Sequence, residues 1–275
     1  ISLGGFSFQP SELAKLTIPL YLAHIFAKKT DRLNDVKNTV LPPLLVCAAF
    51  FLVIYLQNDF STAAFIAVVA ISMFFLSGVR LAYFLFFTIP IFLVLFLLIF
   101  TREYRVSRLI NFVHPNIDPQ GAGYQVAASI KAISSGSIWG KGMGLGTRKL
   151  SSVPEIHSDF IFAAFCEESG FVGLLLYLMV LVFFAWRVYR AAWISKDSFK
   201  SLMLYGLGNT IVLQSLLNLA VISGLLPATG IPLPFFSAGG SSLLITMAIA
   251  GLLVNASAEY PSRKNSKTME AYYRV

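Results

Sequence analysis

Residues 120–173 read QGAGYQVAASIKAISSGSIWGKGMGLGTRKLSSVPEIHSDFIFAAFCEESGFVG. This mostly polar stretch lies between long apolar segments. A polar segment of this length between membrane spans is uncommon unless it is functional or disordered. Its short apolar runs and its aromatic residues argue against disorder. The stretch therefore divides the chain into two groups of apolar segments, and we expect it to carry the function at a membrane surface.

The composition is that of an integral membrane protein with little soluble mass. The 275 residues are 57% hydrophobic and only 12% charged, with a mean hydropathy of +0.75, whereas a soluble domain carries about 25% charged residues. Cys47 and Cys166 lie inside apolar runs, which favours small apolar helix residues over a disulfide. The net charge of +8 comes from cations in loops, where they orient the protein and meet anionic lipid, so nucleic acid is not an expected partner.

Seven apolar runs predict seven transmembrane helices. Each run approaches the roughly 20 residues that cross a bilayer, and each is continuous rather than alternating, which favours helices over barrel strands. The expected fold class is therefore an all-α integral membrane protein, a polytopic helical bundle. The predicted spans cover residues 10–27, 40–56, 60–76, 81–101, 160–186, 202–226 and 233–254.

One transmembrane domain over residues 1–256 accounts for these spans. It includes a large extracellular loop at 102–158, in which residues 123–133 predict a short helix that lies in the interface or partly re-enters the bilayer. Residues 257–275 predict a basic cytoplasmic tail. The chain opens as a loop leading into a helix, so earlier helices are expected to be missing from it.

The short loops predict the orientation. Lysines and arginines gather at 28–37, at Arg80, at 187–200 and in the tail, whereas the links 57–59 and 227–232 contain none. The positive-inside rule places the basic loops in the cytoplasm and the long polar segment outside. That segment nevertheless carries seven cations, which suggests an anionic ligand, with lipid headgroups as the alternative; they are Arg102, Arg105, Arg108, Lys131, Lys141, Arg148 and Lys149.

Two patterns in the long segment bear on such a ligand. Arg102, Arg105 and Arg108 are three residues apart, so a continuing helix would align them in a stripe suited to phosphate or pyrophosphate. The alternating glycines at 140, 142, 144 and 146 match neither a dinucleotide fingerprint nor a P-loop. A flexible loop and a loop whose backbone approaches a bulky lipid headgroup both fit them.

The acidic residues at the end of the segment allow more than one interpretation. Asp159 lies at the membrane edge, where desolvation would make its carboxylate a better base, but on position alone a helix N-cap is favoured. A triad of His157, Ser158 and Asp159 does not fit, because adjacent residues do not give triad geometry. Glu155, His157 and Asp159 could share a cation if extended, although one short cluster is a weak metal signal.

Several polar residues fall within the predicted spans. Glu167 and Glu168 lie two to three turns into the fifth span, and ionisable residues there default to a functional or paired role. Lys15 in the first span is a candidate partner for them. Gln214 and Asn218 are four residues apart on the sixth span, and they are expected to bind neighbouring helices. Prolines and glycines at 227–240 predict an irregular extracellular turn packed over the bundle.

Six motifs resemble the SEDS family, which includes RodA, FtsW and SpoVE. They are QPSELAK (9–15), GAGYQ (121–125), GKGMGLG (140–146), PEIHSDFIFA (154–163), EESGFVG (167–173) and GLLPATGIPLPFFSAGGSS (224–242). The RKL run at 148–150 and the HSD form resemble the FtsW division branch more than RodA. Two departures appear: the family's Gln-Pro-Asp-x-Gly-Thr is QNDFST at 57–62, and Ala238 replaces the usual aromatic residue before the glycine pair.

The resemblance implies a peptidoglycan glycosyltransferase with about ten spans, of which this chain holds the last seven. Its substrate would be lipid II, a disaccharide-pentapeptide on undecaprenyl pyrophosphate. The 4-hydroxyl of the acceptor sugar would attack the anomeric carbon of the donor, with Asp159, the position of the family's essential aspartate, as the base. The departing pyrophosphate needs cations or a divalent ion such as Mg or Mn; no metal ligands are assigned.

The resemblance and the positions of charged residues together predict two groups of site residues. Candidate substrate-binding residues are Lys15, Arg105, Arg108, Lys131, Lys149, Glu155 and His157. Candidate supporting residues are Gln9, Glu12, Asp59, Glu167, Glu168, Ser237 and Gly239.

The resemblance also implies the partners and the location. The usual partner is a class B penicillin-binding protein, a transpeptidase, alongside other division or elongation membrane proteins and membrane lipids. The protein would be a multi-pass protein of the bacterial inner membrane with its active site on the external face and a cytoplasmic C-terminus. Two alternatives remain open, a lipid II flippase and a divisome scaffold that recruits the transpeptidase.

Overall fold

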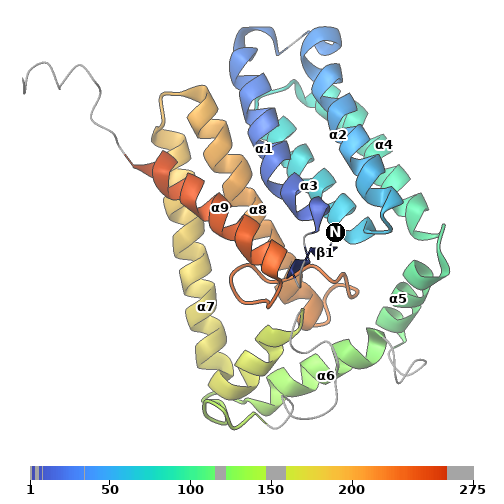
Figure 1. Cartoon of the computed structure of the whole chain (residues 1–275), viewed down its shortest axis with the longest axis vertical. Coiled ribbons are helices and arrows are strands. Elements are labelled where there is room, and N and C mark those ends of the chain that lie inside the picture. Colours follow the sequence, from blue (N-terminus) through green and yellow to red (C-terminus); the bar gives the residue numbers. More distant parts are fainter. Residues whose placement is uncertain are drawn as a thin grey trace, which may run out of the picture.

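The computed structural model describes residues 2–3, 6–7, 9–33, 35–114, 122–146 and 159–258 of the chain. Apart from a minimal antiparallel hairpin of β1 (Ser2–Leu3) and β2 (Phe6–Ser7), the regular structure there is helical. Figure 1 shows the long helices running between two ends of a bundle, with α5 and α6 lying across one of them. The helices are α1 (Pro10–Lys28), η1 (Thr30–Arg32), η2 (Val36–Val40), α2 (Leu41–Leu56), α3 (Phe60–Leu76), α4 (Leu81–Ile99), α5 (Glu103–Val113), α6 (Ala122–Ser135), α7 (Ile161–Ile194), α8 (Ser198–Ile222) and α9 (Gly240–Ser257).

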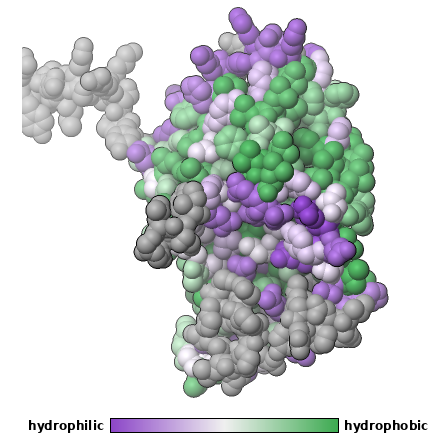
Figure 2. Space-filling view, turned by 45° about the vertical axis from the view of Figure 1, so that its right-hand side comes forward, coloured by the Kyte–Doolittle hydropathy of each residue, from purple (hydrophilic) through white to green (hydrophobic). Residues whose placement is uncertain are grey.

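The helices are those of a polytopic membrane protein, as the composition predicts. Within the described residues, five helical segments are long and apolar enough to cross a bilayer: Val36–Leu56, Leu81–Ile99, Ile161–Ile194, Ser198–Ile222 and Gly240–Ser257. The shorter helix Phe60–Leu76 is apolar as well. Figure 2 shows a hydrophobic zone on the face it draws, bounded by hydrophilic residues toward both ends. The predicted helical membrane fold is confirmed.

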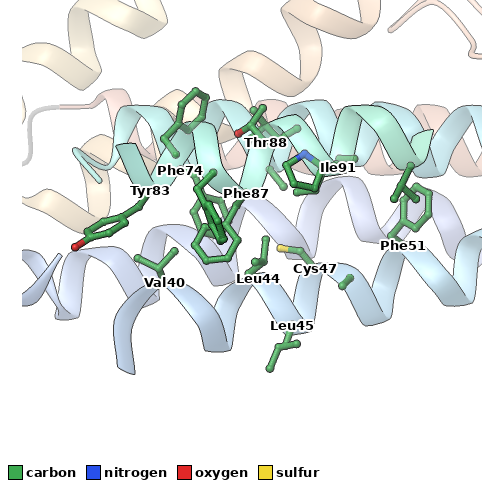
Figure 3. Close-up of a pocket in the computed structure, with 18 of the residues that line it drawn as sticks. Val40, Leu44, Leu45, Cys47, Phe51, Phe74, Tyr83, Phe87, Thr88 and Ile91 are labelled. Atoms are coloured by element: carbon green, nitrogen blue, oxygen red, sulfur yellow. The ribbon is translucent and has the colours of Figure 1, made fainter. Parts of the chain in front are cut away.

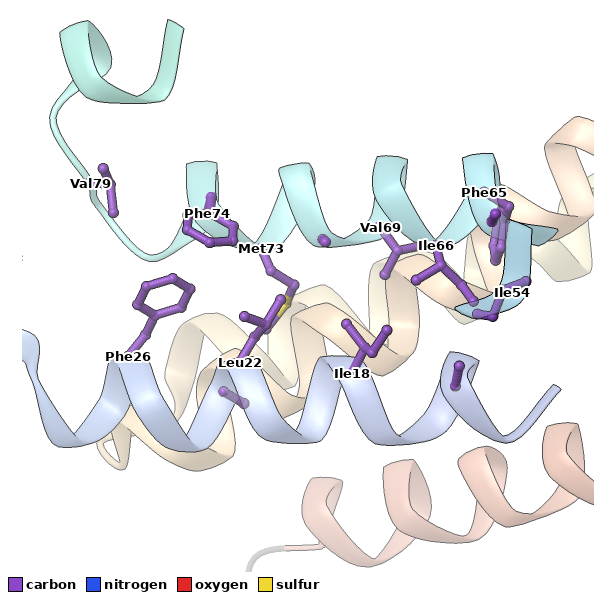
Figure 4. Packing of buried hydrophobic residues seen from close by; sticks show 14 of the residues in the cluster. Ile18, Leu22, Phe26, Ile54, Phe65, Ile66, Val69, Met73, Phe74 and Val79 are labelled. Atoms are coloured by element: carbon purple, nitrogen blue, oxygen red, sulfur yellow. The ribbon is translucent and has the colours of Figure 1, made fainter. Parts of the chain in front are cut away.

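Helix α1 lies within the bundle and packs against α2, α3, α8 and α9. Its side chains Ile18, Leu22 and Phe26 are almost fully buried, and they face Val69 and Met73 of α3 in Figure 4. Because neighbouring helices enclose α1, it can carry a charged pair within the bundle that a lipid-facing helix would not tolerate.

By contrast, α4 is held loosely. Leu95 is its one buried residue, and an apolar cavity of about 400 Å³ lies between α2, α3 and α4. Figure 3 shows Leu44, Cys47 and Phe51 of α2 on one side of this cavity, with Phe87 and Ile91 of α4 on the other. The side chains of α4 therefore face mainly lipid and this cavity.

The predicted ends of three spans differ from the helices. The fifth span was expected at 160–186, but α7 continues to Ile194. The sixth span was expected at 202–226, but α8 starts at Ser198, because the Asp197 carboxylate caps it by accepting from the N–H groups of Phe199 and Lys200. It ends at Ile222, because Gly224 follows with a φ of 73° and stops the helix in the left-handed conformation.

The last span was expected at 233–254, but α9 covers Gly240–Ser257. Residues 233–239 instead form irregular structure together with residues 223–232. Pro232 and Pro234 lack the N–H groups that a helix needs there. We call residues 223–239 the α8–α9 loop.

The long polar segment contains two described helices. The short helix predicted over 123–133 is present as α6 (Ala122–Ser135), and α5 precedes it. The predicted stripe of three arginines is wrong in part, because Arg102 lies in extended conformation before the first residue of α5. Only Arg105 and Arg108 are on the helix, about one turn apart.

Candidate active site

Asp159 lies just before α7, at the first described residue after the long polar segment. The N-cap residue of α7 is Phe160, and no side chain caps the helix there. The predicted alternative of Asp159 as the N-cap is therefore wrong. Its side chain is half-buried, and a Cβ built on Gly230 would lie 3.5 Å from Asp159 Oδ2. The backbone of the α8–α9 loop thus comes close to the carboxylate.

One side chain of α8 joins Asp159 to this loop. The Nδ2 group of Asn218 donates to the carbonyl of Asp159 at 3.0 Å and to the carbonyl of Ile231 at 2.9 Å. Asn218 is 2% exposed, so water does not compete for these two bonds. The amide therefore fixes the backbone of Asp159 relative to Ile231 and to its neighbour Gly230.

The rest of the α8–α9 loop is tied down in the same way. Gln214 Nε2 donates to the carbonyl of Pro232 at 2.7 Å, and the N–H of Leu233 donates to Ser237 Oγ at 2.8 Å. Gln214 and Asn218 were expected to bind neighbouring helices, but their bonds go to loop carbonyls. The predicted supporting residue Ser237 lies within this network.

Helix α5 reaches the same loop, and α6 reaches the end of α8 just before it. Arg108 Nη1 donates to the carbonyl of Ala228 at 3.2 Å, and Ser129 Oγ donates to the carbonyl of Ile222 at 2.7 Å. The loop that approaches Asp159 therefore also contacts a predicted substrate-binding cation, Arg108. Lys131 is exposed on α6.

Arg105 is placed differently from Arg108. It is 5% exposed, and its guanidinium carbon lies 4.5 Å from the ring centroid of Phe60 and 4.8 Å from that of Tyr55. Its Nη1 donates to the carbonyl of Leu98 at 2.8 Å. Burial acts to lower the pKa of this guanidinium, but its bonds to the hydroxyls of Tyr104 and Tyr55 outweigh burial and raise the pKa. A permanent cation thus ties α5 to the ends of α2 and α4.

Lys15 does not pair with the glutamates of α7, so the predicted partnership with Glu167 and Glu168 is wrong. Its Nζ lies 2.7 Å from Oε1 of Glu12 one turn earlier, and both side chains are buried. The ammonium also lies 5.8 Å from the ring centroid of Phe65 on α3. Two predicted site residues, Lys15 and Glu12, therefore form a pair inside the bundle.

A polar cluster joins the first residues of α1, α3 and α9. One oxygen of Asp59 accepts from Gln9 Nε2 and from Ser11 Oγ, each at 2.9 Å, while its other oxygen accepts from the N–H of Thr62 at 3.2 Å. The N–H of Gln9 donates to Ser241 Oγ at 3.1 Å. Two residues predicted as supporting, Gln9 and Asp59, are thus brought together; Gly239, a third, is the N-cap residue of α9.

The glutamates of α7 lie beside a break in that helix. Gly170 has φ 67° and ψ −164°, which is not helical. At the break, the N–H groups of Phe171 and Val172 donate to the carbonyls of Ser137 and Ile138 at 2.9 and 3.2 Å. In a continuous helix they would instead bond the carbonyls of residues 167 and 168.

Those two carbonyls accept from the same loop in return. The N–H groups of Lys141 and Gly142 donate to the carbonyls of Glu167 and Glu168 at 3.1 and 3.0 Å. The fully buried carboxylate of Glu167 pairs with Lys141 Nζ at 2.6 Å. The break therefore exchanges two helical hydrogen bonds for four bonds to residues 137–142.

The glycine run has a function that neither sequence interpretation included. A Cβ on Gly140 would lie 2.1 Å from the carbonyl oxygen of Glu168, and one on Gly170 would lie 2.3 Å from the backbone nitrogen of Gly140. At Gly140 the missing side chain allows backbone to approach the backbone of α7. The partner of Glu167 could not be read from the sequence, because Lys141 is 26 residues away.

Three predicted site residues, Lys149, Glu155 and His157, lie outside the described residues. Among the described residues, no three His, Cys, Asp or Glu side chains come together as metal ligands. No chemical step below depends on a divalent ion.

Comparison with known proteins assigns the chain to a family. Residues 1–261 match the FtsW/RodA/SpoVE family model, described as cell cycle protein. The probable peptidoglycan glycosyltransferase FtsW of Borreliella burgdorferi is 40% identical over 253 residues, which cover 92% of this chain and 70% of that protein. Stage V sporulation protein E of Bacillus subtilis is 35% identical over 257 residues, 94% of this chain and 70% of the other.

Solved structures give the same assignment. One chain in a solved structure of a peptidoglycan synthase complex, which coordinates polymerization and crosslinking, aligns with a TM-score of 0.74 at 27% identity. The alignment covers 94% of this chain and 72% of that one. The rod shape determining protein RodA of Thermus thermophilus aligns with a TM-score of 0.64 at 27% identity, covering 95% of this chain and 70% of the other.

Proposed function

Because the chain belongs to the FtsW/RodA/SpoVE family of cell cycle proteins, we propose that it is a peptidoglycan glycosyltransferase of the FtsW branch. Its substrate is lipid II, which it polymerises into glycan strands. The observation that carries this proposal is the 40% identity with a probable FtsW glycosyltransferase over 92% of the chain. The geometry around Asp159 supports it, because a half-buried carboxylate lies on a backbone fixed by Asn218.

Asp159 acts as the general base in this mechanism. The 4-hydroxyl of the acceptor sugar attacks the anomeric carbon of the donor, and Asp159 takes the hydroxyl proton as the new C–O bond forms. The bond between the anomeric carbon and the pyrophosphate oxygen breaks, and its electron pair leaves with the lipid pyrophosphate. A base must be held within hydrogen-bond reach of the proton it takes, and the bond from Asn218 supports such positioning.

Cations stabilise the charge that develops on the pyrophosphate. Arg108 is the best placed of the predicted residues, because it already contacts the loop that approaches Asp159. Lys131 is exposed on the neighbouring helix α6, and Lys149, Glu155 and His157 complete the proposed substrate-binding set. Arg105 holds α5 in place for Arg108. Inside the bundle, Lys15 remains a proposed substrate-binding residue and Glu12 a proposed supporting residue.

The proposed topology has seven spans, an external active site and a cytoplasmic C-terminus. Its support is that the basic connections between α1 and α2 and between α7 and α8 lie at the end of the bundle opposite α5 and α6 (Figure 1). The proposed partner is a class B penicillin-binding protein. Similarity to a chain of a peptidoglycan synthase complex supports this partner.

The decisive experiment is polymerisation of labelled lipid II by the purified protein, with and without its transpeptidase partner. We expect Asp159→Asn to abolish glycan chains, because the amide cannot accept the proton, while the protein still inserts and still binds its partner. Asp197→Asn is the control, because it makes the same carboxylate-to-amide change at the start of α8, where the amide oxygen can still accept the capping bonds, and it should retain polymerisation. Normal polymer from Asp159→Asn would remove Asp159 as the base, and absence of polymer from the unaltered protein with its partner would favour a transport or scaffold role.

A further inference from the structure

The loop that fills the break in α7 exposes a group of apolar side chains. Within residues 137–146, which we call the clamp loop, Ile138 is 61% exposed, Trp139 81%, Met143 77% and Leu145 68%. Four large apolar side chains this exposed within eight residues form a surface that water does not favour. The backbone of the same loop is fixed, because it supplies four hydrogen bonds to α7.

The apolar surface of the clamp loop continues that of α7. The N–H groups of Phe171 and Val172 donate to the carbonyls of Ser137 and Ile138, so the loop lies directly against these two residues. Phe171 is 56% exposed and Val172 44%, and exposed leucine, methionine and phenylalanine side chains follow along the same candidate membrane span. The surface beside the loop therefore faces lipid.

The depth of the loop in the bilayer follows from the length of α7. From Gly170 to Arg187, which marks the basic end of the span, α7 rises about 26 Å at 1.5 Å per residue. The hydrocarbon core is about 30 Å thick. The break, and with it Ile138 and Trp139, therefore lies close to the opposite edge of the core, at the level where tryptophan is enriched in membrane proteins.

We propose that the clamp loop is a membrane anchor: Ile138 and Trp139 insert at the boundary between headgroups and acyl chains of the leaflet on the side of α5 and α6. The occupant of this apolar surface is the phospholipid bilayer itself. Because the loop replaces the helical bonds of α7 at Gly170, the anchor holds the segment that follows Asp159 at a fixed height above the lipid. This anchor requires only that the protein is inserted in a bilayer, and it does not depend on glycosyltransferase activity.

Tryptophan fluorescence in bilayers tests the anchor. The protein has three tryptophans, so Trp186→Phe and Trp193→Phe leave Trp139 as the single emitter, and both changes keep an aromatic ring on α7. The purified protein is placed in phosphatidylcholine vesicles whose acyl chains carry bromine either near the headgroup or near the methyl end. We expect blue-shifted emission that loses most of its intensity with the shallow bromines and little with aqueous acrylamide.

Two further single-tryptophan variants, built with Trp139→Phe, calibrate the measurement. Met179→Trp, at the middle of the α7 span, should be quenched best by the deep bromines, and Ser198→Trp, at the polar start of α8, by acrylamide alone. Emission from Trp139 that follows acrylamide as Ser198→Trp does, without quenching by either brominated lipid, would overturn the anchor and leave the surface to a protein partner. Quenching by shallow bromines in the correctly calibrated set would support it.

Discussion

The amide of Asn218 is a single side chain on which two segments of the candidate active site depend. Asn218→Ala removes the hydrogen bonds that this side chain donates to the carbonyls of Asp159 and Ile231, and each such bond typically contributes about 0.5–1.5 kcal/mol of stability. We also expect kcat for glycan synthesis to fall about 10-fold to 100-fold, because displacement of a base by about 1 Å can cost that much.

Gln214→Ala is the matched control for this change. It removes a similar bond from the same helix to the same loop, at Pro232, but none from Asp159. Stability should therefore fall in both variants, measured by thermal unfolding in detergent, whereas kcat should fall mainly in Asn218→Ala. Equal losses of kcat in the two variants would show that Asn218 acts only through the loop.

The buried pair of Glu12 and Lys15 gives a second prediction at this scale. Lys15→Met alone leaves the Glu12 carboxylate charged and unpaired inside the bundle, which should cost about 3–5 kcal/mol of unfolding free energy. Glu12→Leu combined with Lys15→Met should recover most of that loss, because no charge then remains buried. A double variant as unstable as Lys15→Met, in denaturant titrations in detergent micelles, would contradict the pairing.

Single residues also show where sequence reasoning stops. Asp159 could be proposed as the base, because a motif surrounds it. The partners of Lys15 and Asn218 could not be predicted. Glutamates occur both on the helix of Lys15 and in another predicted span, and Asn218 donates to backbone carbonyls, which every residue has. The sequence indicates that a polar group in an apolar segment needs a partner, but the tertiary structure determines which residue that partner is.

At the scale of an element, the break in α7 makes Gly170 a position that no other residue can fill without strain. Its φ of 67° and ψ of −164° belong to a region essentially limited to glycine, which costs about 1–3 kcal/mol for other residues. A Cβ would also lie 2.3 Å from the backbone nitrogen of Gly140. Gly170→Ala should therefore lower the melting temperature and weaken the hydrogen bonds between the clamp loop and α7.

Gly251→Ala in α9 is its control, because no atom lies within 4 Å of the added Cβ. A helical glycine replaced by alanine should leave stability unchanged or raise it by about 0.5–1 kcal/mol. Unfolding midpoints of the two variants in the same detergent compare these effects. Gly170→Ala with the stability of Gly251→Ala would mean that α7 can become continuous at little cost.

The elements themselves were predictable where apolar runs are continuous, as in α2, α3 and α4. The α8–α9 loop was predicted only in part: prolines and glycines indicated an irregular turn at 227–240, yet the last span was placed from 233. Ile231 and Leu233 are as apolar as span residues and are equally buried, at 2% and 1% exposure. Hydropathy reports that a residue leaves water, not whether it does so in a helix or in an ordered loop. Only the capping chemistry at Asp197 and Gly224 could have corrected the ends of α8.

For the whole molecule, the testable property is which side of the membrane each end occupies. In a background of Cys47→Ala and Cys166→Ala, Ser107→Cys on α5 should react with a membrane-impermeant maleimide in intact cells from which the outer membrane has been removed. Ser198→Cys at the start of α8 should react only after the cells are lysed. Both positions are exposed, so the reverse pattern would invert the proposed topology.

The exchange of bonds at the α7 break has a consequence for how the chain can change its length. Surface loops ordinarily accept inserted or deleted residues, but the clamp loop pairs with α7 at two places, residues 137–138 and residues 141–142. One residue added or removed between Ser137 and Gly142 would shift one pair of bonds out of register with the other. The identity of its side chains can therefore change far more readily than its number of residues. A β-strand within a sheet is constrained in the same way, because its hydrogen bonds also depend on register.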